Sequence, residues 1–198
     1  MNIKPLVLGV AIMLGVALLM GASLWRLRNR VSGDTSTSYT QPVAPPASGA
    51  IEPVTLYVAD DDTGMLIPRK STIALSGDRQ QRAEGLLREL VSLYLAKSSP
   101  HPLGPGSEVR DVYLVEPGLA VIDLNADFAN GHRSGVLVEE LTMASLVETI
   151  SANVPGIARV KFLVDGKERE TLAGHADLSG SYEVSGVTQM ANALQDSQ

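Results

Sequence analysis

The chain has 198 residues and a formal net charge of −6, but its charges are distributed unevenly. Its first 31 residues contain no Asp or Glu and four cations, Lys4, Arg26, Arg28 and Arg30, which leaves a net charge of −10 on the remainder. The length allows one domain of ordinary size, or two small ones. An acidic body argues against nucleic acid as a partner, and the absence of Cys excludes disulfides, thiolate metal ligands, Cys nucleophiles and a lipidated anchor cysteine.

Residues 5–25 form a stretch without a charged side chain. At about 1.5 Å per residue, a helix of this length reaches roughly 30 Å, the thickness of the hydrocarbon core of a bilayer. Trp25 and Arg26 stand at its end, where they suit the membrane interface. We therefore predict that residues 1–31 are an N-terminal transmembrane anchor with a basic flank, and that residues 5–25 contact membrane lipid. The alternative is a signal peptide cleaved near Ser23.

Residues 32–53 are rich in Ser, Thr, Pro and Ala, which is typical of a disordered linker. Such a linker has an end-to-end distance of roughly 25 Å. The three arginines that follow the uncharged stretch favour a cytoplasmic location for the body, because positive flanks tend to stay inside.

From residue 54 onward the pattern becomes that of a folded domain. Residues 54–59 and 65–75 are predicted strands separated by a turn at 60–64, and Pro68 places the second strand at a sheet edge or bulge. Asp78 is a predicted cap of a helix in which apolar residues recur every three to four positions up to Tyr94. A loop rich in Pro and Gly follows at 98–107.

The second half repeats this alternation of strands and helices. Residues 109–116 and 119–125 are predicted to form a hairpin, residues 136–153 a largely buried helix, and residues 159–164 a further strand before a turn at Asp165-Gly166. The order ββαββαβ predicts an α+β fold, a two-layer sandwich with two helices on one face of a small mixed sheet. This domain is expected to cover residues 54–180, and residues 181–198 to form a polar tail with a short helix.

No catalytic, cofactor-binding or metal site emerges from the candidate residues. The three histidines, His101, His132 and His175, lack the spacing of metal ligands and are interpreted as exposed loop residues. The run Asp60–Asp62 lacks the later Glu of a calcium loop and is interpreted as a solvated turn.

A hydrolase is the remaining catalytic hypothesis. It would use Ser134 with His132 and either Asp123 or Asp127, but no G-x-S-x-G motif surrounds Ser134, which is interpreted as a helix cap. No P-loop and no G-x-G-x-x-G motif occurs, so no cofactor is predicted.

Seven segments between residues 54 and 178 resemble the GerMN domain, which is found in membrane-anchored sporulation and germination proteins. The two most specific are Ala120–Phe128 (AVIDLNADF) and the pair Leu146–Ile150 and Val160–Gly166 (VKFLVDG). The others are Val54–Asp60, Leu66–Arg69, Ala83–Leu87 and Pro105–Val109. Two features depart from the family pattern: a longer loop at 98–106 replaces the usual Gly-Pro, and the lipobox Cys is absent, which favours a transmembrane anchor.

The resemblance implies a non-enzymatic, extracytoplasmic module similar to the ring-building folds of secretion assemblies, in which Asp123 and Asp165-Gly166 are structural. We therefore expect a single-pass protein of the bacterial inner membrane whose domain acts in protein–protein interaction or assembly at the cell envelope, with an unidentified envelope protein or a second copy as partner. A membrane-tethered hydrolase or small-ligand-binding domain is the alternative function. A tethered cytoplasmic regulator is the alternative topology.

Overall fold

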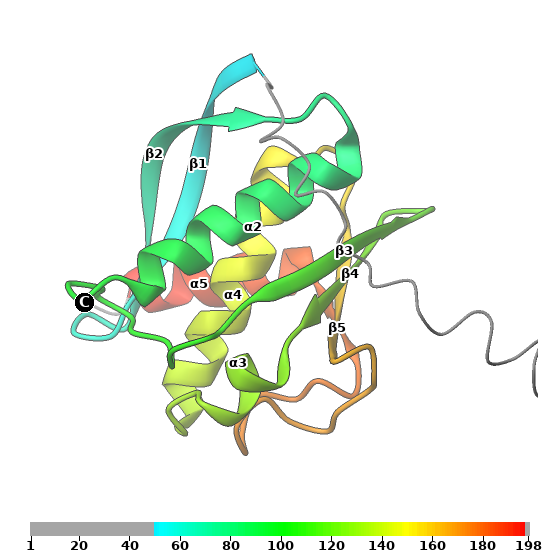
Figure 1. The fold of residues 1–198 in the computed structure, drawn as a ribbon. Helices are drawn as coiled ribbons and strands as arrows, with labels where there is room; N and C mark the ends of the chain where they lie inside the picture. The colour runs from blue at the N-terminus through cyan, green and yellow to red at the C-terminus, as the bar shows by residue number, and fades with distance from the viewer. Residues whose placement is uncertain (1–49, 197–198) are drawn as a thin grey trace, which may run out of the picture. The chain divides into compact units, whose positions relative to one another are not determined.

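The computed structural model describes residues 50–196, so the predicted anchor at 1–31 and most of the predicted linker lie outside the described residues. Between residues 50 and 196, none of the helices combines the length and the apolar character that crossing a membrane requires. The elements, shown in Figure 1, are β1 (Ala50–Asp60), β2 (Met65–Leu75), α2 (Arg79–Leu95), β3 (Val109–Val115), β4 (Leu119–Leu124), α3 (Ala126–Asn130), α4 (Val136–Asn153), β5 (Arg159–Val164), β6 (Ser181–Glu183) and α5 (Val184–Asp196).

The strands form two sheets. β1 and β2 pair only with each other as an antiparallel hairpin, whereas the second sheet has the order β3-β4-β5-β6. Within it, β4 and β5 are parallel and the other two pairs are antiparallel. The α+β class is thus confirmed, and the prediction of one small sheet carrying two helices is wrong, because the first hairpin remains separate.

The hairpin stays separate because polar side chains of α4 occupy the free edge of β1. The amide of Asn153 accepts a hydrogen bond from the N–H of Thr55 (3.1 Å) and donates one to its carbonyl (2.7 Å). Thr149 accepts from the N–H of Tyr57 (3.0 Å), and Ser145 donates to the Tyr57 carbonyl (2.7 Å). These bonds satisfy backbone groups that a third strand would otherwise pair, so a helix lies where the next strand of a continuous sheet would be.

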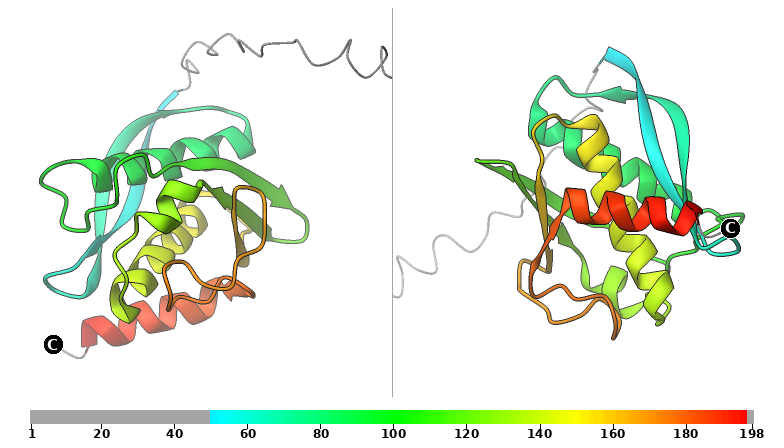
Figure 2. Two further views of the ribbon diagram at one scale, coloured as in Figure 1. Left: turned by 60° about the horizontal axis from the view of Figure 1, so that its bottom comes forward. Right: turned by 180° about the vertical axis from the view of Figure 1, so that it is seen from behind.

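Helix α4 is the centre of the domain. Figure 1 shows it between the β1–β2 hairpin and the four-stranded sheet, and the rear view in Figure 2 shows α5 lying across it. Every residue from Leu141 to Ile150 is buried, which confirms the prediction of a largely buried helix. The remaining core comes mainly from the inward faces of both sheets and of α2, with contributions from α3, from the loop between β5 and β6, and from α5.

The domain begins earlier and ends later than the sequence indicated. β1 starts at Ala50, so residues 50–53 of the predicted linker belong to a strand. Residues 181–196 were expected as a polar tail with a short helix. The helix is confirmed as α5, but the segment also forms β6 and is not merely a tail, because α5 buries Val187 and Ala191 against the core. The short helix α3 was not predicted. It begins after Asn125, whose side chain accepts from the N–H of Phe128.

Candidate functional site

A polar cluster around Thr142 of α4 joins three segments to that helix: the turn with Asp61, the loop with His101, and the loop with His132 and Arg133. His101 Nδ1 lies 2.6 Å from a carboxylate oxygen of Asp61, and its Nε2 lies 2.6 Å from Thr142 Oγ1. His132 Nε2 approaches the same hydroxyl at 2.7 Å, while its Nδ1 lies 2.7 Å from the carbonyl of Arg133. The guanidinium of Arg133 closes the cluster by pairing with Asp61. Three segments distant in sequence are thereby fixed to one turn of helix.

The protons in this cluster can be counted. Each Nδ1 faces an oxygen that only accepts, a carboxylate for His101 and a carbonyl for His132, so each Nδ1 carries a proton. Thr142 has one hydroxyl proton to share among the Val138 carbonyl and the two Nε2 atoms. It cannot satisfy both rings if both are neutral. With both rings neutral, the hydroxyl can donate to one Nε2 at a time, so the two histidines compete for its proton.

The surroundings of Asp61 and of the two histidines determine which of them is ionised. Burial of Asp61 works to raise its pKa, but its hydrogen bonds with His101 and Arg133 outweigh this effect and leave the pKa lowered. Burial lowers the pKa of His101 and of His132, although Asp61 opposes the effect on His101. Asp61 is thus the ionised partner, and burial favours the neutral form of both histidines.

A second cluster is organised by Glu139 of α4, whose side chain is fully buried. One carboxylate oxygen accepts from the backbone N–H groups of Ala173, His175 and Ala176 at 2.9–3.0 Å. The other accepts from the N–H of Gly135 and contacts His175 Nδ1 at 2.9 Å. Burial works to raise the pKa of Glu139, but the hydrogen bonds from His175 and these backbone groups lower it to about 2. Glu139 therefore holds the 173–176 loop against the start of α4 as an ionised anchor.

Ser134 lies beside this cluster without forming a catalytic triad. Its hydroxyl is 3.3 Å from His175 Nδ1, the same nitrogen that contacts Glu139. A triad needs the acid and the nucleophile on opposite nitrogens of the imidazole. Because both partners share Nδ1, the histidine cannot relay a proton from the serine in this arrangement.

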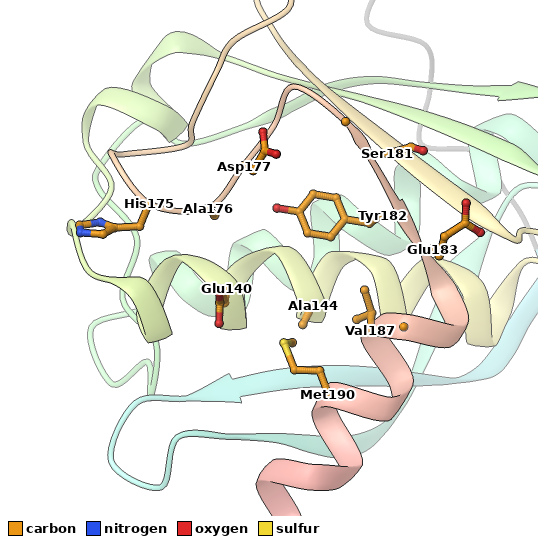
Figure 3. Close-up of a pocket in the computed structure, with 12 residues that line it drawn as sticks. Glu140, Ala144, His175, Ala176, Asp177, Ser181, Tyr182, Glu183, Val187 and Met190 are labelled. Carbon is orange, nitrogen blue, oxygen red and sulfur yellow. The ribbon is translucent and has the colours of Figure 1, made fainter.

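A pocket of about 470 Å³ opens between α4, the loop after residue 175, β6 and α5 (Figure 3). Its lining combines acidic and apolar residues: Glu140, Ala144, His175, Ala176, Asp177, Gly180, Ser181, Tyr182, Glu183, Gly186, Val187 and Met190. The ring of Tyr182 packs edge-on against Phe162, with ring centroids 5.5 Å apart. Figure 3 shows the tyrosine reaching across the space between Asp177 and Glu140.

The structure places several predicted site residues differently from the sequence analysis. His101 and His132 lie in loops but are buried, so their interpretation as exposed residues is wrong, because each finds Thr142 as a partner. Asp61 belongs to that cluster rather than to a fully solvated turn. Within residues 50–196, no group of three or more His, Asp or Glu side chains is arranged to hold a metal ion.

The residues of the hydrolase hypothesis are dispersed. Ser134 contacts His175 instead of His132, and Gly135 rather than Ser134 is the N-cap of α4. Asp123 accepts from the N–H of Gly166 (2.8 Å), a structural role that agrees with its interpretation, and Asp127 lies in α3. Asp165 and Gly166 both adopt positive φ (50° and 70°), as the turn between them requires.

Glu139 and Thr142 were missed as cluster residues. The signal that could have found them is the presence of polar side chains within a helix that is otherwise apolar, because a buried polar group requires a partner. Their partners lie as many as 41 residues away in loops, which no local pattern connects.

The fold and the two clusters define an α+β module. In it, buried polar side chains of the central helix α4 form hydrogen bonds with the surrounding loops and with the edge of β1. The chain belongs to the Germane family, described as sporulation and spore germination, whose model matches residues 55–170. The resemblance to GerMN domains is thus confirmed.

Two solved structures with similar folds come from the sporulation protein GerM of Bacillus subtilis. Its tandem GerMN domains are 20% identical to this chain with a TM-score of 0.53, and the match covers 67% of this chain and 46% of that one. Its first GerMN domain is 19% identical with a TM-score of 0.47, covering 64% and 92%. The chain thus spans about half of the tandem structure. A comparison with curated proteins finds no match.

Proposed function

We propose that this chain is a non-enzymatic GerMN-type module that is held at the bacterial inner membrane by residues 5–25 and binds an extended segment of a partner protein at the cell envelope. The observation that carries the proposal is the open outer edge of β2. An uncharged stretch of membrane-spanning length and a linker composition before the domain support the anchored arrangement.

The register of the hairpin identifies the open backbone groups. The N–H and carbonyl of Thr55 bond to α4, away from β2, so Thr55 and its partner Lys70 form a non-hydrogen-bonded pair of the antiparallel ladder. The same alternation turns the backbone of Thr72 and Ala74 away from β1. Within residues 50–196, no hydrogen bond reaches the outward groups of Lys70, Thr72 or Ala74, and all three residues are exposed.

An exposed edge of this kind is a template for an added strand. The opposite edge of the hairpin is closed by α4, and near the turn Gln195 of α5 donates to the carbonyl of Leu66 (3.4 Å). The accessible portion is thus the stretch of β2 after Pro68, which agrees with the prediction of an edge strand. Lys70 at this edge is typical of strands protected against indiscriminate pairing.

The experiment is site-specific photo-crosslinking of the full chain in cells. A photoreactive residue at position 70 is expected to give one discrete adduct with a partner protein, whereas the same residue at exposed Gln80 of α2 gives none. Thr72→Pro is expected to abolish the adduct because it removes an outward N–H. Thr72 and Pro53 form a non-hydrogen-bonded pair, like Lys70 and Thr55, so the N–H of Thr72 points away from β1 and the hairpin loses no bond. Thr72→Ala is the matched control and is expected to keep the adduct.

Equal crosslinking from positions 70 and 80, or an adduct that survives Thr72→Pro, would refute the edge as the docking site. An adduct with twice the mass of the chain would show that the edge pairs with a second copy of this chain instead of a different protein.

The side of the membrane is tested separately by protease accessibility of residues 32–53 in spheroplasts. We expect cleavage, because the family resemblance implies an extracytoplasmic domain. Protection of these residues would instead place the domain in the cytoplasm, as the arginines at 26–30 favour.

A further inference from the structure

We propose that the pocket between α4, β6 and α5 binds the arginine or lysine side chain of an extended basic peptide. This site is separate from the β2 edge, and the proposal does not depend on it. The pocket lies within the volume range of sites that accept organic groups.

The ionised side chains that line the pocket are negative. Glu140 on α4 and Glu183 on β6 have no ion-pair or hydrogen-bond partner within residues 50–196, and Asp177 accepts from Ser179. Lys161, whose charge helps to lower the pKa of Asp177, donates to the backbone carbonyl of Ser179 and does not line the pocket. Arg159 faces Glu183 across the β5–β6 ladder but forms no ion pair with it. A cationic group entering here would find two carboxylates, Glu140 and Glu183, without a side-chain partner among the described residues.

The floor of the pocket is apolar. Ala144, Ala176 and Val187 are buried at 1–6% exposure, and Met190 is packed partly against the same core. Arginine and lysine combine an aliphatic stem with a charged head, so the stem suits this floor while the head reaches the carboxylates at the rim. A small inorganic cation would leave the apolar floor without contact.

Tyr182 is the polar group between floor and rim. Burial raises its pKa to about 12, and the charges of Asp177, Glu140 and Glu139 add to the effect. Its phenol is therefore protonated at neutral pH, and the ring presents an edge-packed aromatic surface within the pocket. Aromatic faces bind guanidinium and ammonium groups favourably.

The strand beside the pocket indicates that a peptide carries the cation. The N–H of Val184 bonds to the Ala158 carbonyl, so in the antiparallel alternation Ser181 and Glu183 turn their backbone groups away from β5. Both residues are exposed and both line the pocket, and within residues 50–196 no loop or side-chain group bonds to the backbone of Ser181, whereas the carbonyl of Glu183 begins helix α5. An extended peptide beside β6 can pair with this edge while one side chain enters the pocket.

The test is a titration of the full chain in mild detergent, observed through the ¹³C-methyl signal of Met190 and assigned with Met190→Leu. The probe is the capped tripeptide acetyl-Gly-Arg-Gly-amide, and its matched control has neutral citrulline in place of arginine. We expect the arginine peptide to shift the Met190 signal in a saturable manner at millimolar concentration, and the citrulline peptide to leave it unchanged.

Glu140→Gln combined with Glu183→Gln is expected to weaken this response about fivefold, since each exposed carboxylate contributes modestly. Glu108→Gln, which neutralises an exposed carboxylate outside the pocket, is expected to leave it unchanged. Thr72→Pro is also expected to leave the response of Met190 to the arginine peptide unchanged. A failure of the β2 proposal can therefore be distinguished from a failure of the pocket proposal. An equal response to citrulline, no shift at 10 mM, or full binding by the double variant would overturn the proposal. Tighter binding of spermidine than of the peptide would assign the pocket to free polyamines instead.

Discussion

Replacing Glu139 by glutamine tests whether one buried carboxylate fastens the 173–176 loop to α4. The substitution keeps the shape of the side chain but exchanges one oxygen for an NH₂ group. One oxygen of Glu139 accepts three loop N–H groups, and the other accepts from Gly135 and contacts His175. Whichever way the amide of Glu139→Gln turns, a donor faces donors, so the variant loses bonds and gains a repulsive contact.

The magnitude follows from the pKa of Glu139. A fall from the ordinary value of 4.5 to about 2 corresponds to about 3.4 kcal/mol at 1.36 kcal/mol per unit. The neighbouring His175 side chain is 41% exposed, so solvent screening reduces the expected contribution to about 2 kcal/mol. Because the folded-state pKa is lowered, this stabilisation is complete above pH 4.5 and is lost as the pH falls through about 2.

The assay is urea unfolding of the full chain in mild detergent, followed by far-ultraviolet circular dichroism at pH 7 and pH 3. Glu139→Gln is expected to lower the free energy of unfolding by about 2 kcal/mol at pH 7 and to flatten its dependence on pH. Amide hydrogen exchange at 173–176 should accelerate. Glu140→Gln, the same change one residue away at an exposed position, should cost less than about 0.5 kcal/mol. Equal stability of Glu139→Gln and wild type at pH 7 would refute the anchoring role.

Three further substitutions probe other parts of the structure by urea unfolding. Thr142→Val deletes the hydroxyl shared by the two buried histidines and should lower the free energy of unfolding by about 1–3 kcal/mol. Thr142→Ser keeps the hydroxyl and should cost much less. Equal losses of stability in the two variants would show that the hydroxyl contributes nothing. Asn153→Leu leaves the N–H and carbonyl of Thr55 without partners and should lower the free energy of unfolding by about 2 kcal/mol. Amide hydrogen exchange at Thr55 should accelerate, and an unchanged exchange rate there would contradict the role of Asn153. Gly104→Ala places a Cβ 2.7 Å from the carbonyl oxygen of Gly131 and should lower the free energy of unfolding by about 1–3 kcal/mol. A variant as stable as wild type would show that the two loops can move apart at little cost.

Local patterns predicted most helices and strands, because each depends on periodicity within its own segment. The helix at 136–153 has its predicted bounds, and Asp78 caps α2 by accepting from the N–H of Gln81. The division into two sheets could not be predicted in this way. It depends on Ser145, Thr149 and Asn153, which stand at intervals of four and form a polar stripe on an apolar helix. That stripe is visible in the sequence, but its partner strand is not.

The candidate sites show the same limit. A histidine in a loop is exposed unless another segment covers it, and His101 is buried because Thr142 and Tyr94 lie against its ring. The pocket likewise includes α5, which the sequence presents as a short helix in a polar tail. Its acidic rim becomes apparent only when β6 and α5 fold back onto α4.

The closure of β1 by α4 has a consequence for synthesis of the chain. The hairpin leaves the ribosome well before the residues that cover it, because Thr55 and Asn153 are 98 residues apart. At roughly 5–20 residues per second, translation of that interval takes on the order of 5–20 s. During this interval both edges of a two-stranded ribbon are exposed, and such a ribbon is marginally stable in water. The nascent chain therefore passes through a period in which both edges of the hairpin can pair with other strands.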